Sequence, residues 1–349
     1  GFMARRSPLM IATVALLAAA PASAETLGEF YSGKMLTIIT WQGPGTSYDA
    51  YARLIARHMG KFIPGAPQFR VQLLRGGGGI LAANHVATIA PKDGTILFMV
   101  GPGLVVEQAL GLNKALVADM RTFGLLGSLS ASNQTLVTWH TSPTKTLKIA
   151  MERETTVGAT GVGSVSYQLP AFYNSLVGTK FKIISGYAEA TLIEAAMERG
   201  ELEGRGTNPW ATYKSLRPHY ISQKLIIPII QTGLKKERDL PDVPLLRDLA
   251  RSEADRAPID FISKSAALGR PVSTTPDVPK ERLAALVAAF EKLVVDPEFV
   301  ADIQKQKLEL EPMRADALAK IIREMIEIPE AIRDRVKRAT LPPADAAKK

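Results

Sequence analysis

Short apolar runs alternate with segments of helical periodicity along most of the chain. The first run predicts a strand at residues 35–41, and apolar residues at three- and four-residue intervals predict a helix over 51–62. Further strands are expected at 69–74 and 95–100, separated by a helix at 80–89. This alternation is typical of a parallel sheet covered by helices, so we expect the α/β class.

A change in the pattern near residues 125–132 indicates that the chain enters a second domain there. Gly127 and several serines precede a new strand at 135–139, and beyond it the alternation begins again. The expected strands of this second block are 156–160, 181–185 and 225–231, and its expected helices are 167–177 and 192–199. A length of 349 residues also favours two domains, each with its own core.

The last third of the chain is expected to return to the first domain. Pro241, Pro244 and Pro258 mark a loop-rich stretch, and the sequence is helical from Pro279 onward. Two apolar stripes in this part, which we interpret as core packing, are Leu283, Leu286, Val287, Phe290 and Leu293, and Leu318, Ile321, Ile322, Met325 and Ile328. We therefore expect lobe 1 at residues 25–130 and 261–341, lobe 2 at 131–260, and a disordered tail at 342–349.

The N-terminal segment, residues 1–24, has the layout of a signal peptide. Met3 is followed by a basic pair, Arg5 and Arg6, by an apolar stretch at 9–20, and by small residues at 22–24 that suit cleavage. An uncleaved anchor is the weaker reading, because the apolar stretch is shorter than the roughly 20 residues a bilayer needs. We expect a mature chain that begins at Glu25 and lies in the periplasm, and we set Gly1 and Phe2 aside as an added extension.

Composition excludes several classes of chemistry. The absence of cysteine removes disulfides, thiolate nucleophiles and sulfur-ligated zinc. Loss of Arg5 and Arg6 with the signal segment lowers the formal net charge from +9 to +7. This modest excess suits a receptor for anions or an ordinary basic surface, and export argues against a nucleic-acid partner.

The turn after the first expected strand is the strongest candidate for a ligand contact. Its residues are Gly45, Thr46, Ser47, Tyr48 and Asp49. Glycine lets the backbone approach a ligand, and a hydroxyl can cap the following helix while other N–H groups stay free. Such a helix start holds a carboxylate without a lysine or arginine. A turn and cap with no ligand is about equally compatible with the pattern.

A similar turn opens a helix in the second block. Its candidate residues are Thr160, Gly161, Gly163 and Ser164. Two such turns, one in each lobe, are expected to grip one anionic molecule across a cleft that closes around it. The four-glycine run at 76–79, with Gly77 and Gly78, is a less specific third candidate.

Enzyme signatures are weak in this sequence. Gly161 and Gly163 begin a dinucleotide-binding fingerprint, but Ser166 stands where its third glycine is needed. The sequence has no phosphate-binding GxxxxGK[ST], no GxSxG and no HExxH motif. The four histidines are scattered singly, so we interpret them as structural and expect neither a metal site nor a cofactor; they are His58, His85, His140 and His219.

Several segments in order resemble the periplasmic receptors of tripartite tricarboxylate transporters, the TctC or Bug family. The segments that carry the resemblance, which covers nearly the whole mature chain, are 45–49, 75–83 with 90–95, 186–187 through 195–204, and 242–244. The resemblance implies a type II periplasmic-binding-protein fold with two α/β lobes, a hinge and a central ligand cleft. It also implies that no cofactor is bound and that an organic acid, which we expect to be a di- or tricarboxylate or an aromatic carboxylate, is delivered to one large and one small membrane subunit. We further expect a monomer without catalytic activity.

The resemblance also implies which residues hold the ligand carboxylate. They are Gly45, Thr46, Ser47 and Asp49 in lobe 1, with Asp49 orienting the loop, and Thr160, Gly163 and Ser164 in lobe 2. The chain departs from the family pattern after Tyr187, where Glu189 lies between two alanines. Glu189 is expected either to contact an amine or hydroxyl of the ligand or, as we favour, to be an exposed charge at a helix start. Tyr48, Tyr187 and Trp210 are expected to line the ligand body or to be half-buried packing residues.

Two other functions fit the same pattern. The clamp can serve a sensor that reports its ligand to a signalling partner, and an exported α/β enzyme is the alternative from another class. Missing catalytic motifs argue against the enzyme, whereas neighbouring genes for transporter subunits or for a histidine kinase would separate transport from sensing.

Overall fold

The computed structural model describes residues 25–130 and 132–340. The expected signal segment and C-terminal tail lie outside these residues. Within the described ranges, no helix is both long and apolar enough to cross a membrane.

The first lobe is built on a six-stranded sheet with the order β11-β4-β10-β3-β1-β2. Its strands are β1 (Met35–Thr40), β2 (Gln68–Leu73), β3 (Ile96–Met99), β4 (Gly124–Ser128), β10 (Pro271–Thr274) and β11 (Met313–Arg314). Strand β1 is parallel to β2 and β3, whereas β10 runs antiparallel to β3 and β4. The returning strand β10 is therefore inserted between β3 and β4.

The second lobe repeats this arrangement in a five-stranded sheet with the order β7-β6-β8-β5-β9. Its strands are β5 (Gln134–Trp139), β6 (Thr155–Gly158), β7 (Phe181–Ile184), β8 (Gly204–Pro209) and β9 (Ile226–Thr232). Strand β6 is parallel to β7 and β8, and β5 is antiparallel to β8 and β9. The chain crosses once from β4 to β5 and returns to β10, which confirms the predicted fold of two α/β lobes.

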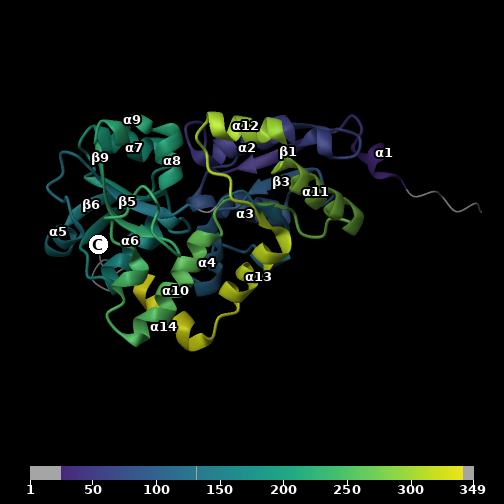
Figure 1. The fold of residues 1–349 in the computed structure, drawn as a ribbon. Coiled ribbons are helices and arrows are strands. Elements are labelled where there is room, and N and C mark those ends of the chain that lie inside the picture. Colours follow the sequence, from purple (N-terminus) through teal and green to yellow (C-terminus); the bar gives the residue numbers. More distant parts are fainter. Residues whose placement is uncertain (1–24, 131, 341–349) are drawn as a thin grey trace, which may run out of the picture.

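Helices cover both sheets. Those of the first half are α1 (Leu27–Tyr31), α2 (Ser47–His58), α3 (Ile80–Thr88), α4 (Pro102–Leu110), α5 (Leu147–Glu152), α6 (Val165–Leu176) and α7 (Ala190–Glu198). Those that follow are α8 (Trp210–Leu216), α9 (Pro218–Ser222), α10 (Glu253–Ala267), α11 (Lys280–Leu293), α12 (Pro297–Lys305), α13 (Ala315–Ile326) and α14 (Glu330–Thr340). Single turns of 3-10 helix lie at Gly60–Phe62, Gly77–Gly79, Met120–Thr122 and Leu246–Leu249. Figure 1 shows the lobe of β5, β6 and β9 on the left and that of β1 and β3 on the right.

The apolar stripes of the last third are core packing, as the sequence predicts. Leu286, Phe290 and Leu293 of α11 are buried, and so are Leu318 and Ile322 of α13. The last helix behaves differently. Helix α14 packs mainly against α6 of the second lobe, and it also contacts α4 and α10 (Figure 1). The lobe boundaries stay a prediction, because α14 and also α10, which begins before residue 261, contact elements of both lobes.

The prediction of a loop-rich stretch through Pro258 is wrong in its second half. Pro258 lies inside α10, where it removes one backbone hydrogen bond near the start of the helix. The apolar residues that follow it, Ile259, Phe261 and Ile262, are buried. Burial of this face outweighs the loss of one hydrogen bond, so the helix forms across the proline.

Candidate functional site

The lobe 1 wall of the cleft is the turn between β1 and α2. Thr46 is the N-cap of α2: its hydroxyl accepts from the Asp49 N–H at 3.3 Å and donates to the Gly43 carbonyl at 2.8 Å. The Asp49 carboxylate pairs with Arg53, one helical turn further on, at 2.8 Å. Trp41, Gln42 and Tyr48 line the cleft, whereas Gly45, Thr46, Ser47 and Asp49 shape the turn behind them.

The lobe 2 wall is the turn between β6 and α6. Ser164 stands at the N-cap of α6, but its hydroxyl accepts no N–H of the helix and donates to the Gly161 carbonyl at 2.8 Å. The Ser166 hydroxyl lies 2.7 Å from that of Ser164 and accepts from the Thr160 N–H at 3.1 Å. Thr160, Gly163 and Ser164 line the cleft together with the first turn of α6, so the positive end of this helix faces the space between the lobes.

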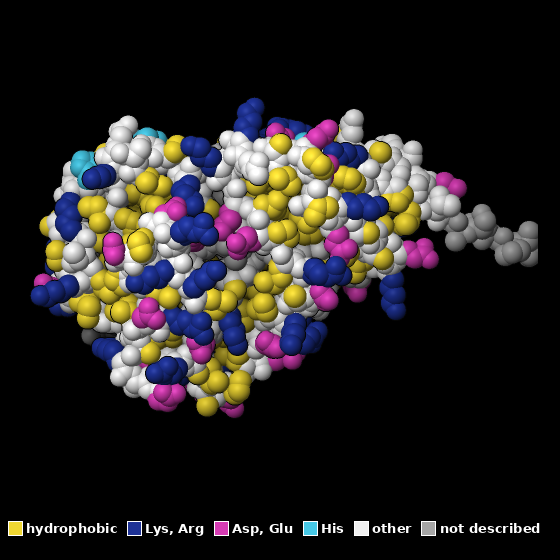
Figure 2. Space-filling model, viewed as in Figure 1, with side chains coloured by type: hydrophobic (Ala, Val, Ile, Leu, Met, Phe, Trp, Pro, Cys, Tyr) yellow, Lys and Arg dark blue, Asp and Glu magenta, His cyan; other side chains and the backbone are white. Residues whose placement is uncertain are grey.

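Two arginines that sequence reasoning missed complete the cleft. Arg205 of β8 is 4% exposed and Arg270, directly before β10, is 5% exposed; both line the same space as Tyr48 and Ser164. The cavity between these walls has a volume of about 30 Å³. Figure 2 shows basic side chains on the outer face where the lobes adjoin, interleaved with acidic ones.

Arg270 is held in place by lobe 1. Its guanidinium lies 4.3 Å from the centroid of the Tyr48 ring, and its Nε and Nη2 donate to the Ser47 hydroxyl at 3.2 and 2.9 Å. Ser47 does not line the cleft itself, so it can influence a ligand only by orienting the Arg270 guanidinium. No carboxylate of residues 25–130 or 132–340 forms an ion pair with Arg270, so its charge remains available to the cleft.

Arg205 is part of a buried charge group in lobe 2. Its Nη1 lies 3.1 Å from a Glu194 oxygen, and the other oxygen of Glu194 lies 2.8 Å from Arg217 Nη2. Two guanidinium groups thus share one carboxylate, which leaves one net positive charge on this side as well. Both walls of the cleft favour a negatively charged occupant.

Three hydrogen-bond donors of the cleft-lining residues are unused. Trp41 Nε1, Arg205 Nε and Asn208 Nδ2 are buried and have no hydrogen-bond acceptor among the residues that the structure describes. A buried donor without an acceptor costs about 1 to 3 kcal/mol, and native proteins keep few of them. Arg205 and Asn208 also face the buried hydroxyl of Tyr213, which lies outside the cleft lining, so Trp41 Nε1 is the donor that indicates an acceptor group in the cleft.

Gly77 and Gly78 do not line the cleft; they close it. A Cβ at Gly78 would lie 2.7 Å from the Ser164 nitrogen, and one at Gly161 would lie 2.8 Å from the Gly78 nitrogen. The two lobes therefore meet backbone to backbone beside the cleft. Only glycine permits this approach, and Gly78, with φ of 69°, also needs its freedom at positive φ.

Glu189 joins the lobes and is not the exposed charge that we favoured. Its side chain is 12% exposed and accepts from the Gly43 N–H at 3.0 Å and from Arg75 Nη2 at 2.7 Å. Next to it, the Ala190 N–H donates to Gln42 Oε1 at 3.2 Å. These contacts hold the start of α7 against the β1–α2 turn.

The other two aromatic candidates belong to packing clusters outside the cleft lining. Tyr187 packs beside Ile193 and Leu202. Trp210 is buried in a cluster with Tyr213, and its indole N–H donates to an Asp239 oxygen at 3.3 Å.

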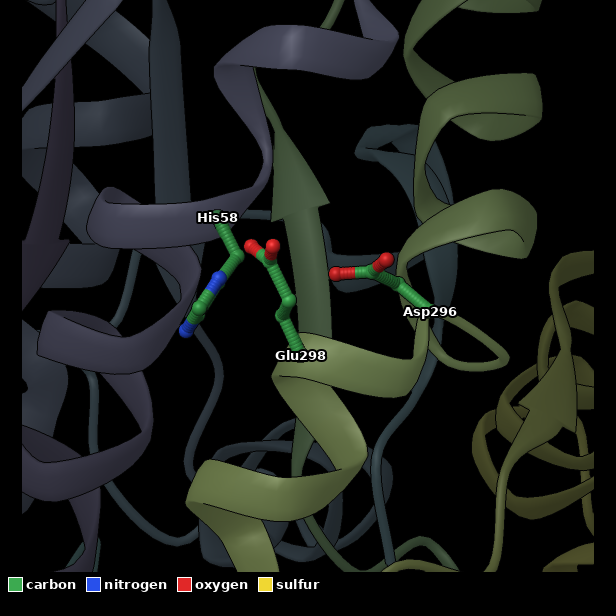
Figure 3. Close-up of side chains that lie close together, drawn as sticks. All are labelled: His58, Asp296 and Glu298. Carbon is green, nitrogen blue, oxygen red and sulfur yellow. The ribbon is translucent and has the colours of Figure 1, made fainter.

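A separate polar cluster lies between α2 and α12. His58, Asp296 and Glu298 lie close together (Figure 3), and one potential ligand atom from each lies within 4.8 Å of the others. The Lys61 ammonium, however, lies 2.9 Å from Asp296 and 3.1 Å from Glu298, and His58 Nε2 lies 2.5 Å from Asp302. These partners account for the charge of the cluster, which ties α12 to α2.

Comparison with known proteins places the fold. The chain has the two-lobed fold of periplasmic binding proteins. It is similar to the periplasmic binding protein BugD (16% identity over 88% of this chain and 98% of that chain; TM-score 0.70). It is also similar to MatC from Rhodopseudomonas palustris with bound malate (18% identity over 88% of this chain and 99% of that chain; TM-score 0.68). A third similar structure is Rpa4515 from R. palustris with adipate (16% identity over 88% of this chain and 97% of that chain; TM-score 0.68). Neither a family model nor a curated protein sequence matches the chain.

Proposed function

We propose that the chain is a solute-binding protein that closes its two lobes on a carboxylate of a small organic acid. The observation that carries this proposal is the meeting of two buried arginines, Arg205 and Arg270, with the unused indole N–H of Trp41 in one cleft between the lobes. The negative charge of a carboxylate pairs with the arginines, and its oxygen lone pairs accept hydrogen bonds from the unused donor. The start of α6 adds the favourable end of a helix dipole.

The similar structures support an acid as the ligand. MatC was solved with malate and Rpa4515 with adipate, both of which carry carboxylates. We extend the proposal to delivery of the acid to the large and small membrane subunits of a tripartite tricarboxylate transporter, and to a periplasmic location after removal of residues 1–24. The resemblance in sequence and the signal-peptide pattern support these parts. The proposed role is non-catalytic, because the sequence has no GxxxxGK[ST], GxSxG or HExxH motif and the similar structures are binding proteins.

A thermal-shift series with malate, adipate, citrate and benzoate tests the proposal. An acid present at 100 times its Kd should stabilise the protein by about 2.7 kcal/mol and raise Tm accordingly. The Arg270→Gln variant should lose this response. Arg199→Gln removes the same charge from an exposed ion pair with Glu201 and serves as the matched control. The proposal fails if no acid raises Tm or binds in calorimetry, or if Arg270→Gln responds like the control.

Delivery is tested separately. Uptake of a labelled acid should be lost in cells that lack this chain and restored by the wild-type chain but not by Arg270→Gln. Uptake that is unchanged in the deletion strain would remove the transport role and leave acid binding in place.

A further inference from the structure

The start of α7 contacts the turn between β1 and α2 at two consecutive residues. The Glu189 carboxylate accepts from the Gly43 N–H at 3.0 Å and pairs with Arg75 at 2.7 Å. The next residue, Ala190, donates its main-chain N–H to Gln42 Oε1 at 3.2 Å. Because α7 follows β7 of the second sheet and the turn follows β1 of the first, these bonds exist only while the two lobes are together.

Gln42 takes part in this contact and also lines the cleft, and the residue is 4% exposed. A main-chain N–H can be accepted only by the oxygen of a side-chain amide, so the bond from Ala190 fixes which end of the amide is which. No hydrogen bond joins Gln42 Nε2 to a group of residues 25–130 or 132–340. Of the two polar atoms of this side chain, Nε2 is therefore the one available to an occupant of the cleft.

Trp41, the preceding residue, brings a second donor to the same space. Its indole Nε1 is buried, and among the described residues it has no acceptor. Two neutral donors thus lie at the end of β1, and Arg270 supplies a charged donor from the residue before β10. A carboxylate has about four lone-pair sites on its two oxygens, so it can accept from an arginine and from an amide at the same time.

Separation of the lobes would release the Gln42 amide. Without the Ala190 N–H, the amide turns about its last side-chain bond, and its oxygen faces the cleft as readily as its nitrogen. A ligand bond that forms at full strength only in the closed state favours closure by the free energy of that bond. Gln42 can therefore couple recognition of the ligand to closure of the lobes.

We propose that Gln42 is a ligand-binding residue and that the Ala190 N–H orients it: closure of α7 onto the β1–α2 turn holds Oε1 and presents Nε2 to an oxygen of the bound acid. This inference rests on the proposed function, because the acceptor is the carboxylate held by Arg270. Ala190 is then a positioning residue, which acts on the ligand through Gln42.

Calorimetry tests the role of Gln42, with whichever of malate, adipate, citrate and benzoate raises Tm most as the probe. Gln42→Met keeps the length of the side chain and removes both polar atoms, so Kd should rise about tenfold. Gln42→Glu keeps an oxygen for the Ala190 N–H but has no amide donor and adds a negative charge, so it should lose at least as much affinity. The same two substitutions at Gln223, an exposed residue outside the cleft lining, should leave Kd unchanged.

Ala190→Pro tests the orienting bond. Ala190 is the first residue of α7, a position where helices accept proline, and Glu189 before it is extended (φ −160°, ψ 168°), as proline requires of its neighbour. The substitution therefore removes the N–H and keeps the helix. Ala315→Pro makes the same change at the first residue of α13, after an extended Arg314, and is the matched control. Kd should rise about fivefold in Ala190→Pro and stay at the wild-type value in Ala315→Pro.

A double variant separates orientation of Gln42 from a general effect on closure. If Ala190→Pro acts through Gln42, it should change Kd by less than about twofold in the Gln42→Met background. An equal rise in both backgrounds would show that proline only hinders closure, and the inference would be wrong. Should Ala190→Pro not fold, Glu189→Ala, which removes the neighbouring bond to Gly43, takes its place in the comparison.

The remaining outcomes also decide the matter. If Gln42→Met or Ala190→Pro binds the acid as the wild type does while Arg270→Gln does not bind it, the inference is wrong and the proposed function stands. If no acid binds the wild-type chain, the proposed function fails and the inference with it.

Discussion

The guanidinium of Arg270 lies over the ring of Tyr48, 4.3 Å from its centroid, and this pair joins the crossover back to lobe 1 with helix α2 of the cleft. Because Ser47 accepts two hydrogen bonds from the same guanidinium, both the direction and the plane of Arg270 are fixed before a ligand arrives. A preorganised charge loses little entropy on binding.

Arg270→Lys should therefore weaken acid binding about 10- to 100-fold although the charge is kept. Lysine provides neither the planar fork nor the stacking surface. Calorimetric Kd values for the tightest acid of the thermal-shift series give the measurement. Wild-type affinity in this variant would show that charge alone matters.

Asn208→Asp should abolish most of the binding. The substitution is nearly isosteric, but it replaces an unused donor of the cleft by a carboxylate that repels the ligand. We expect affinity to fall by at least tenfold at pH 8. Asn113→Asp is the matched control, because the Asn113 side-chain oxygen accepts from the Ala115 N–H and aspartate keeps that role. Equal Kd values for the two variants would contradict the assignment of Asn208 to the cleft.

Gly78→Ala should hinder closure of the lobes. The added Cβ would meet the Ser164 nitrogen at 2.7 Å, and the backbone at Ser164 has little freedom to move away. Gly33→Ala places alanine at a similar φ, 73°, where the Cβ meets no atom of residues 25–130 or 132–340 within 4 Å. Both variants should lose about 1 kcal/mol of stability from positive φ. Only Gly78→Ala should also bind acid more weakly and show a larger radius of gyration in small-angle scattering with acid present.

Glu107 should make stability fall as pH rises. It is 1% exposed in α4, and burial raises its pKa to about 7, with a Gln168 hydrogen bond at 3.3 Å opposing the rise. Between its ordinary value near 4.5 and pH 7, the folded state holds a proton that the unfolded state has lost, so increasing pH favours unfolding.

Glu107→Gln should remove this dependence. The variant should match the wild type near pH 4.5 and exceed it by on the order of 1 to 3 kcal/mol at pH 8.5. Urea unfolding at a series of pH values measures the difference. A gap that does not change with pH would mean that Glu107 titrates normally in the folded protein.

The turns at the strand ends were accessible to sequence reasoning because their chemistry is local. Thr46 caps α2 within four residues of chain, and Ser164 begins α6 after a glycine-rich turn, so both elements can be placed without knowledge of the other lobe. Their meeting across the cleft follows from the repeated topology.

The two arginines were not accessible because their roles depend on tertiary packing. Arg205 lies on β8, a strand whose glycines and asparagine hide the usual apolar pattern. Gly206 is required there, since any Cβ would overlap the Ser166 carbonyl of α6. The strands expected from the sequence for the second lobe did not include β8, the middle strand of its sheet. A gap between residues 199 and 225 in the expected elements was the signal that a strand had been missed there. Arg270 comes from a distant part of the chain and reaches Tyr48 only when β10 inserts into the first sheet.

The seating of α14 on α6 has a practical consequence for dissecting this protein. A fragment that ends before Glu330 lacks α14 and exposes the surface of α6 that α14 covers. A fragment limited to residues 131–260 lacks α14 as well. Either piece should aggregate on expression, whereas co-expression of the missing C-terminal peptide should restore solubility. The C-terminal end of the chain, which follows the returning segment of lobe 1, thus supplies a helix that covers lobe 2.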